Sequence, residues 1–223
     1  GTSADTLSGG AGNDTLIGVS DAPSLLGAGT ANAFDNALWV KTATTIVADQ
    51  TSGPPGFDAG QNADYAIASA NGNTLQNVNV VSGQTYRFSL YIKAVSPSSW
   101  VQIASSTGFD TTNTWVNFNA STGAVGANMG SAVKAGDFSS VAVGGDWYLV
   151  SLSATATSSN AAGRFLFQVL NNDATSRTTG YSGSTPTTVA LWGGSFITDG
   201  ADSLSGGDGA DSLSGLLGND TLS

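Results

Sequence analysis

Short runs of alternating apolar and polar residues predict an all-β centre of the chain. Strands are expected at 64–69, 74–80, 84–94, 99–105, 113–119, 147–155, 163–170 and 187–197. Gly, Pro, Asn and Asp cluster between these runs, at intervals typical of sandwich folds. No apolar period of a helix extends beyond a turn or two. The pattern therefore predicts an antiparallel β-sandwich.

The strand at 84–94, QTYRFSLYIKA, alternates without a break. Its odd and even positions point to opposite faces of a sheet. One face is apolar and belongs in a core. The other face combines a ring with two cations, Arg87, Tyr91 and Lys93.

Three further strands, 99–105, 113–119 and 163–170, also pair an apolar face with a polar one. If these strands share a sheet with 84–94, one surface gathers eight rings, cations and amides: Arg87, Tyr91, Lys93, Trp100, Gln102, Trp115, Arg164 and Gln168. Rings of this kind stack on sugars, while the cations and amides bind hydroxyls and carboxylates. The surface is a predicted glycan groove; the alternative is ordinary exposed aromatics, or a ring covered by a loop or a partner. Trp39, Trp147 and Trp192 are expected to pack inside.

Both ends of the chain repeat with a period of nine residues. Residues 9–17 read GGAGNDTLI, residues 197–223 read ITDGADSLS, GGDGADSLS and GLLGNDTLS, and residues 1–8 are a copy that lacks its first residue. A flexible Gly/Asp/Ser linker is the alternative. A linker does not keep a Leu two residues after each Asp that recurs with the nine-residue period, as these repeats do, so an ordered repeat is favoured.

Each repeat combines a glycine-rich turn, a hard oxygen ligand and a three-residue strand. It resembles the RTX calcium-binding β-roll, whose pattern GGxGxDxUx is matched by residues 9–17 and 206–214. The resemblance implies that Ca²⁺ is bound by aspartates and by carbonyls of the glycine-rich half, which here are Asp5, Gly10, Gly12, Asp14, Asp202, Gly207, Gly209, Asp211 and Asp220.

An ion in such a roll lies between one repeat and the next but one, so the two N-terminal repeats complete no site alone. We therefore expect residues 1–18 and 197–223 to stack as one roll, with residues 19–196 inserted as the sandwich. This requires Gly18 and Ile197 to lie close together, as the termini of an inserted domain must.

Composition narrows the function classes. The chain of 223 residues has no Cys, no His and no Glu, so all 16 acidic residues are Asp, and the net charge is −10. The repeats carry 7 Asp and no basic residue, so bound cations would neutralise them. Such a surface disfavours nucleic acid as a partner. No apolar stretch approaches the length of a membrane span. The chain begins inside a repeat, so we expect it to be a piece of a longer protein. Within that protein we expect it to be a monomeric module.

A second resemblance rests on the order of FDNALWVK, VVSGQTYRFSLYIKA, WVNFNASTGAVG, VGGDWYLVSLSATA and VALWGGSFI. This succession is similar to jelly-roll domains that serve as carbohydrate-binding modules in bacterial polysaccharide-degrading enzymes, and as receptor-binding or structural domains in phage tails. The resemblance implies a ligand across the concave sheet. It also implies a structural calcium, for which Asp21, Asp35 and Asp199 are alternatives.

Catalysis is disfavoured because glycoside hydrolysis usually needs two opposed carboxylic acids, and the central Asp residues lie mostly in turns. A lyase site at Arg87, Tyr91 and Lys93 is the enzymatic alternative. We expect a non-catalytic carbohydrate-binding module for an anionic rather than a neutral polysaccharide. The RTX resemblance implies a secreted, extracellular bacterial protein with type I-like export. An adhesin or surface-layer spacer is the alternative.

Overall fold

A computed structural model describes residues 6–17, 24–27, 33–56, 62–177, 181, 185–199, 203–214 and 221–223. Within these residues the chain forms strands and no helix, and no helix long and apolar enough to span a membrane is found. The strands are β1 (Thr6–Ser8), β2 (Thr15–Ile17), β3 (Val40–Ser52), β4 (Asn62–Leu75), β5 (Val78–Val80), β6 (Thr85–Ala94), β7 (Trp100–Ser105), β8 (Trp115–Asn119), β9 (Val125–Met129), β10 (Phe138–Gly144), β11 (Trp147–Thr155), β12 (Asn160–Gly163), β13 (Phe165–Leu170), β14 (Thr187–Asp199), β15 (Ser203–Ser205), β16 (Ser212–Ser214) and β17 (Thr221–Leu222).

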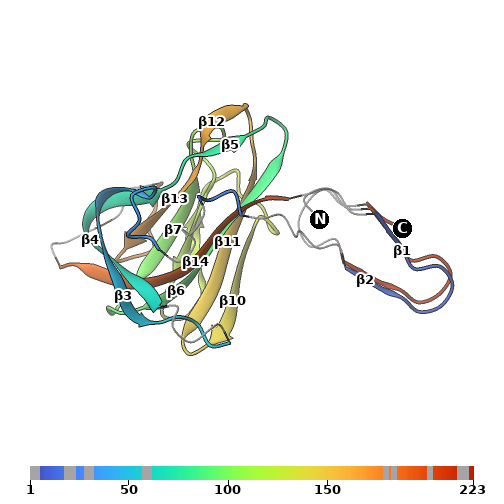
Figure 1. The fold of residues 1–223 in the computed structure, drawn as a ribbon, viewed down its shortest axis with the longest axis horizontal. Coiled ribbons are helices and arrows are strands. Elements are labelled where there is room, and N and C mark those ends of the chain that lie inside the picture. Colours follow the sequence, from blue (N-terminus) through green and yellow to red (C-terminus); the bar gives the residue numbers. More distant parts are fainter. Residues whose placement is uncertain are drawn as a thin grey trace.

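The predicted all-β fold, a sandwich inserted into a short parallel roll, is confirmed (Figure 1). The hydrogen-bonded order of the large sheet is β10-β11-β6-β14-β4-β13-β7-β8-β9, with β3 beside β4. Every pairing in it is antiparallel. Strand β11 has the predicted bounds, and β6, β7, β8 and β13 differ from prediction by one or two residues at an end.

Strand β4 turns this long sheet into two facing layers. Its first part, Asp64–Ala68, pairs with β14, whereas Thr74 and Leu75 pair with β13. The chain bends between the two parts, where the register with β3 shifts. Gly72 lies in this bend, and a Cβ on it would collide with the carbonyl oxygen of Thr42, so only glycine permits the close approach. A strand that changes sheets at a bend is how sandwich corners are made.

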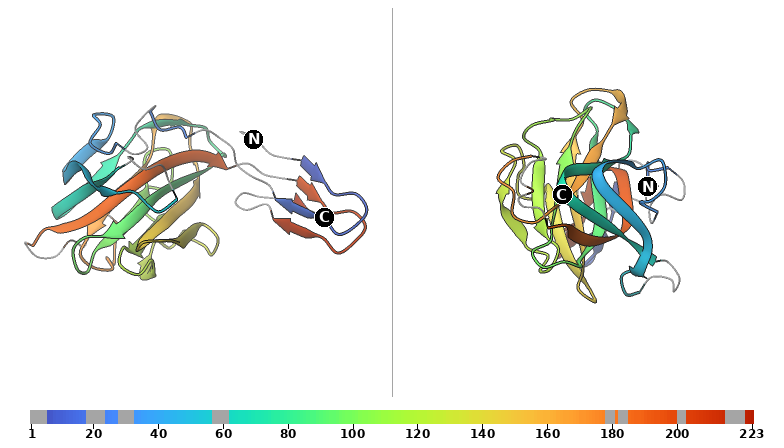
Figure 2. Two further views of the ribbon diagram at one scale, coloured as in Figure 1. Left: turned by 60° about the horizontal axis from the view of Figure 1, so that its bottom comes forward. Right: turned by 90° about the vertical axis from the view of Figure 1, so that its left-hand side faces the viewer.

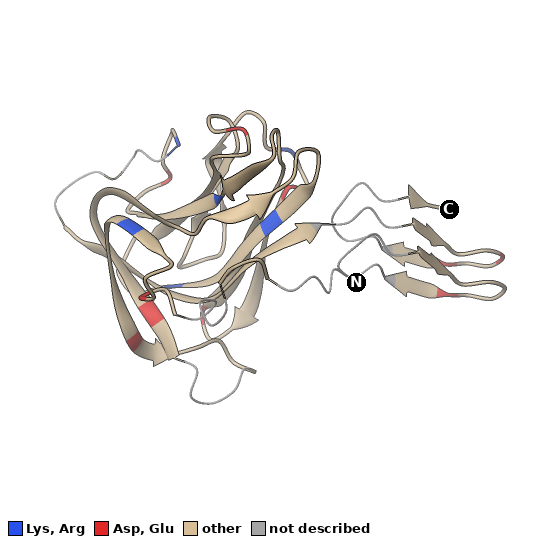
Figure 3. Cartoon of the chain, turned by 45° about the horizontal axis from the view of Figure 1, so that its top comes forward, with Lys and Arg blue, Asp and Glu red and all other residues tan. Residues whose placement is uncertain are grey.

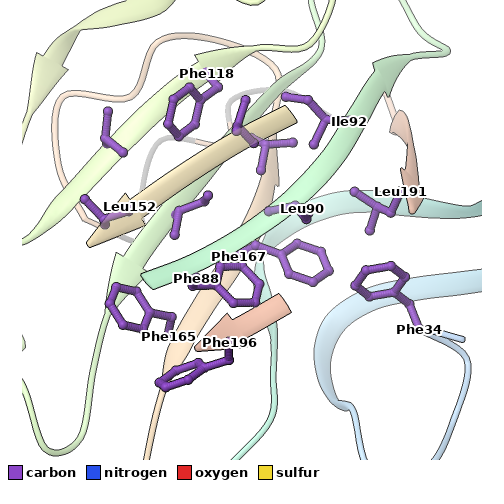
Figure 4. Packing of buried hydrophobic residues seen from close by; sticks show 14 of the residues in the cluster. Phe34, Phe88, Leu90, Ile92, Phe118, Leu152, Phe165, Phe167, Leu191 and Phe196 are labelled. Carbon is purple, nitrogen blue, oxygen red and sulfur yellow. The ribbon is translucent and has the colours of Figure 1, made fainter. Parts of the chain in front are cut away.

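The core lies between the layers (Figures 2 and 4). Phe88 of β6 and Phe165 of β13 are separated by two strands in the hydrogen-bonded order, yet their rings stack with centroids 6.2 Å apart. Phe196 of β14 joins them, 5.4 Å from Phe165. Burial of each such side chain contributes about 1.5–3 kcal/mol. Trp39 is also buried in this core, beside Phe34, as its predicted packing role requires.

Strand β3 was not expected, and neither were β9, β10 and β12. Ala43 and Asp49 of β3 have positive φ angles of 49° and 56°, next to the two places where its register with β4 shifts. Each irregularity interrupts the alternation by which a strand is recognised in a sequence. The predicted strands at 64–69 and 74–80 are also different, because residues 62–75 form one strand through the bend.

The two ends of the chain build one roll, with the repeats in alternate layers. Strands β1, β15 and β17 form one parallel layer, and β2 and β16 form the other. The first repeat thus pairs with the third, the second with the fourth and the third with the fifth. Leu204 pairs with Leu7 and Leu222 and is fully buried, whereas Leu222 on the end strand is 50% exposed. Gly18 lies outside the described residues, and Ile197 belongs to β14, which pairs with β6 of the sandwich as far as Asp199.

Candidate calcium centre and glycan-binding surface

Two glycine-rich turns stack directly on one another in the roll. Residues 9–14 join β1 to β2, and residues 206–211 join β15 to β16, so the blue and red turns run side by side at the far end of Figure 1. The Asp208 N–H donates to the Gly10 carbonyl at 3.0 Å, and the Gly12 N–H donates to the Asp208 carbonyl at 2.8 Å. These bonds hold the two turns at the spacing of neighbouring strands.

The Asp211 carboxylate reaches the backbone of Asp14 in the neighbouring turn. The Asp14 N–H donates to Oδ1 of Asp211 at 2.9 Å. Oδ2 of Asp14 is buried and accepts no hydrogen bond. A buried carboxylate oxygen without a partner is costly unless a cation or a donor reaches it. This orphaned oxygen is the feature of the turns that a bound cation would satisfy.

The glycines of the second turn are required by how closely the turns approach. A Cβ on Gly207 would collide with the carbonyl oxygen of Gly10, and one on Gly209 with that of Gly12. The oxygen atoms available to a metal ion are those of the two carboxylates and of a set of backbone carbonyls. These are the hard oxygen ligands that Ca²⁺ takes in flexible geometry, so the residues present fit that ion.

The structure says less about the other predicted calcium ligands. Asp5, Asp202 and Asp220 lie outside the described residues, as does Asp21 of the proposed structural site. Asp35 lies in the sandwich, where its N–H and that of Phe34 donate to the buried Asp64 carboxylate, and nothing is known of the Asp199 side chain. Within the described chain no group of three or more acidic side chains could hold a metal.

The eight predicted glycan ligands do not share one surface. Arg87, Tyr91 and Lys93 lie on the outer face of β6, while Trp100, Gln102, Trp115, Arg164 and Gln168 belong to β7, β8 and the segment of β13. Because the apolar faces of both groups meet in one core, their polar faces point in opposite directions. The eight residues were expected on one surface if their strands shared a sheet. The strands do share one hydrogen-bonded order, but the bend in β4 puts them in two facing layers.

The face of β7 and β8 is largely covered. Residues 171–177 cross it, with Asp173 accepting from the Asn117 amide at 2.6 Å and the Ser176 carbonyl accepting from the Gln102 amide at 3.1 Å. Gln102 and Gln168 are fully buried, Trp115 is 6% exposed, and Trp100 alone of the four keeps a partly exposed ring. Trp115 packs in a small cluster with Leu75, Ala104 and Leu166.

The outer face of β4, β6, β11 and β14 carries a second group of rings, which we call the aromatic face: Tyr65, Tyr91, Trp147 and Trp192. Tyr91 and Trp192 are cross-strand partners, with ring centroids 5.3 Å apart in an edge-on arrangement. Trp147 and Trp192 are only 3% and 5% exposed, so their predicted packing role holds. Tyr65 and Tyr91 remain partly exposed above them.

Cations border the aromatic face. Lys93 lies in the same cross-strand row as Ala190 and Tyr65, and its Nζ donates to the Gly145 carbonyl at 2.8 Å. Arg87 lies further along the same side of β6. Burial among these neighbours raises the pKa of the Tyr91 hydroxyl, so this ring presents a neutral hydroxyl. Figure 3 shows the blue cationic positions on the sandwich and none on the roll.

Comparison with known families decides the nature of the two ends. The RTX calcium-binding nonapeptide repeat matches residues 1–22 and 197–223, in four copies. Residues 1–22 and 197–223 are RTX repeats. RTX repeats bind calcium, and the turns at 9–14 and 206–211 lie within the matched residues, so they are the candidate calcium centre. Such repeats are typical of secreted bacterial proteins.

The chain has a structural likeness to several solved structures. A carbohydrate-binding module in complex with β-1,4-galactotriose, TmCBM61, has a TM-score of 0.44 and 10% identity over 78% of this chain and 98% of its own. The enzymatically active domain of bacteriophage CBA120 tailspike protein 4 gives 0.40 and 12% over 78% and 21%. The xylan-binding domain of Paenibacillus barcinonensis Xyn10C gives 0.40 and 9% over 73% and 86%. No curated protein matches the chain.

Two features of the site were missed at the sequence level. Trp192 was assigned to packing alone, yet it supports Tyr91 next to a β-bulge at Gly193 and Gly194, where the register with β6 shifts. The WGGS motif signals that bulge, since paired glycines within a strand often mark one. Arg177, whose guanidinium donates to the Ser105 carbonyl, was also not singled out. It lies in a loop, and no periodicity in the sequence places a loop residue on a sheet.

Proposed function

We propose that this chain is a non-catalytic carbohydrate-binding module with a calcium-binding RTX roll, carried by a longer secreted bacterial protein. The polysaccharide lies on the aromatic face. The observation that carries this proposal is the Tyr91–Trp192 ring pair, held at 5.3 Å on one sheet face with Lys93 and Arg87 on the same strand.

The rings supply the apolar part of sugar recognition. Tyr65 and Tyr91 are partly exposed, and Trp147 and Trp192 support them from within the same cluster. A ring fixed by neighbours loses little side-chain entropy when a ligand stacks on it. A sugar ring that covers Tyr91 would also place its hydroxyls near the tyrosine hydroxyl, which stays neutral and is able to donate.

The cations favour an anionic polysaccharide over a neutral one. Two of the chain's 6 basic residues, Arg87 and Lys93, border the aromatic face, in a chain whose net charge is −10. A locally basic face attracts anionic ligands even though the protein as a whole is acidic. We infer that carboxylate or sulfate groups of the polysaccharide bind at Arg87 and Lys93.

The calcium roll acts in folding and presentation rather than in sugar contact. It lies at the end of β14 beyond the sandwich, and its turns face away from it (Figure 1). Calcium bound by Asp14 and Asp211 would neutralise the charges of these two aspartates and join the N-terminal repeat to the C-terminal one. The roll thereby joins the two ends of the chain, which flank the sandwich, in calcium-rich extracellular surroundings.

Affinity electrophoresis against neutral, uronate and sulfated polysaccharides tests the proposal. We expect Tyr91→Ala to weaken retention by about 5- to 30-fold, which corresponds to about 1–2 kcal/mol for a stacked ring. Trp100→Ala is the matched control, because Trp100 lies on the opposite layer. Tyr91→Phe separates the ring from its hydroxyl.

The two alanine variants discriminate between the faces of the sandwich. Loss of binding in Trp100→Ala with unchanged binding in Tyr91→Ala would move the site to the β7 face. No retention of the folded wild-type chain by any polysaccharide would contradict a binding module. The function would then be that of an adhesin or surface-layer spacer stiffened by calcium.

A further inference from the structure

Two arginines from distant parts of the chain converge at one end of the second layer. Arg164 immediately precedes β13, and Arg177 ends the segment that crosses the β7 face. The Arg177 guanidinium donates from Nε and Nη2 to the Ser105 carbonyl, at 3.2 and 2.8 Å. Ser105 pairs in register with Phe165, the residue after Arg164, so both arginines lie at the same end of the β7–β13 pair.

Neither guanidinium has an ionic partner among the described residues. Nη1 of Arg164 donates only to the neutral Asn77 amide oxygen, at 3.2 Å, and its Nε is buried with no acceptor. No salt bridge to Arg164 or Arg177 occurs in the part of the chain that the structure describes. Each arginine therefore retains donors that the protein does not use.

Among the described residues, Asp110 is the acidic group that acts on Arg177, and its carboxylate is already hydrogen-bonded. The Asp110 carboxylate accepts the N–H groups of Thr112 and Asn113 at 2.8 and 2.9 Å. Burial lowers the pKa of Arg177, the positive charge of Arg164 lowers it further, and Asp110 opposes both. The positive charge of Arg164 and the negative charge of Asp110 thus act on Arg177 in opposite directions, and the Asp110 carboxylate already accepts two backbone N–H groups.

We propose that Arg164 and Arg177 form a binding site for one oxyanion, a carboxylate or a sulfate group. Guanidinium donors match the paired oxygens of such groups, and an anion would satisfy the unused donors. Asn77 borders the site, because its side-chain oxygen accepts from Arg164. It lies on the layer opposite the aromatic face, so it does not depend on the function proposed there.

Titration of the full chain with sodium sulfate, followed by NMR of the arginine Nε–H signals and by calorimetry, tests the site. We expect Arg164→Gln to weaken sulfate binding by roughly tenfold, because one of two cations is lost. Asp110→Asn should strengthen it by roughly threefold, since a nearby negative charge is removed while the turn is kept. Lys134→Gln, an exposed lysine in the loop before β10, should change it by less than about twofold at 0.15 M salt.

A second titration with polygalacturonate separates a free ion from a polymer-borne one. Sulfate alone would indicate a free-ion site, and retention of the polymer that is lost in Arg164→Gln but kept in Tyr91→Ala would indicate a polysaccharide subsite; both support the proposal. Arg164→Lys, which keeps the charge and loses the fork, should bind with intermediate affinity, and it replaces the glutamine variant if that variant unfolds. No binding of either probe by the wild type, or equal binding by Arg164→Gln and Lys134→Gln, would overturn the site.

Discussion

The sandwich and the roll are both built from β-strands, but different forces hold them together. The sandwich has a continuous core in which Phe88, Phe165 and Phe196 are at most 2% exposed. Among the described residues of the roll, Leu204 is the one buried hydrophobic side chain. The roll instead brings Asp14 and Asp211 together, with a buried carboxylate oxygen that has no partner.

This difference teaches how each part achieves stability. A two-layer sandwich of this length buries enough apolar surface to fold without an ion. Five repeats of nine residues bury too little, so binding free energy of the metal becomes folding free energy. Calcium should therefore control one part of the molecule and leave the other unaffected.

The largest expected effect is a cavity in the sandwich core. Phe165→Ala removes a ring whose centroid lies 5.0 Å from that of Phe109 and 5.4 Å from that of Phe196. We expect the free energy of unfolding of the sandwich to fall by about 3–5 kcal/mol. Denaturant unfolding followed by tryptophan fluorescence measures it, because all 5 tryptophans lie in the sandwich.

Val141→Ala is the control for that cavity, since Val141 on β10 is 52% exposed and its loss should cost under about 0.5 kcal/mol. Calcium affinity should be the same in both variants. If Phe165→Ala abolished calcium binding while the sandwich was still folded, the two parts would not be independent.

Calcium removal should act on the roll by a smaller amount. Calcium at 100 times its dissociation constant stabilises a folded site by about 2.7 kcal/mol. Asp211→Asn should remove that contribution, and chelation should do so in the wild type. Hydrogen exchange of residues 6–17 and 203–214 should rise, while tryptophan fluorescence stays unchanged.

Asp208→Asn provides the matched control, because Asp208 lies in the same turn but its side chain is exposed and not a predicted ligand. Equal loss of calcium binding in both variants would argue that net charge, not ligation, holds the ion. Unfolding of the sandwich upon chelation would show that the roll is docked on it.

The smallest expected effect is a pH dependence inside the sandwich. Burial raises the pKa of Asp64 above its ordinary value of 3.8, although Phe34 and Asp49 donate backbone N–H groups to it. The folded state then binds this proton more tightly than the unfolded one. The stabilisation from this proton is fully present when the pH is below the ordinary pKa of 3.8, and it is lost as the pH rises through the folded-state pKa.

Asp64→Asn should cost about 1–2 kcal/mol in lost hydrogen bonds and should remove this pH dependence. Thermal unfolding between pH 3 and 7 checks both. Asp110→Asn should remove a pH dependence of the opposite sign. Backbone N–H groups of Asn113 and Thr112 lower the pKa of Asp110, so the stabilisation from its carboxylate is lost only as the pH falls. The same sign in both variants would contradict the assignment.

Local chemistry explains what could be predicted. The alternation of QTYRFSLYIKA assigned Phe88 and Leu90 to the core and Tyr91 to the outside, and the structure agrees. Alternation assigns a side chain to a face of its own strand, however, and not to a layer of the sandwich. Tyr91 and Trp100 were therefore placed together, although the bend of β4 at Gly72 sets them on opposite sides.

Covering segments could not be predicted for a similar reason. The burial of Gln102 depends on the Ser176 carbonyl, 74 positions away, and no period in the sequence relates them. The same segment brings Arg177 to Ser105. Long-range contacts of this kind follow from how loops pack, which depends on the whole fold.

The sequence by itself determined the nine-residue repeats and the all-β character of the centre, because each is a periodic pattern that depends on short-range geometry. It led to the hypothesis that the two ends form one roll, and the pairing of alternate repeats in the structure confirms that hypothesis. Only the tertiary structure decided which rings share a surface, which amides are covered and which arginines meet. Those outcomes depend on β4 passing from one layer to the other, and a single bend of that kind changes every neighbour without changing any local pattern.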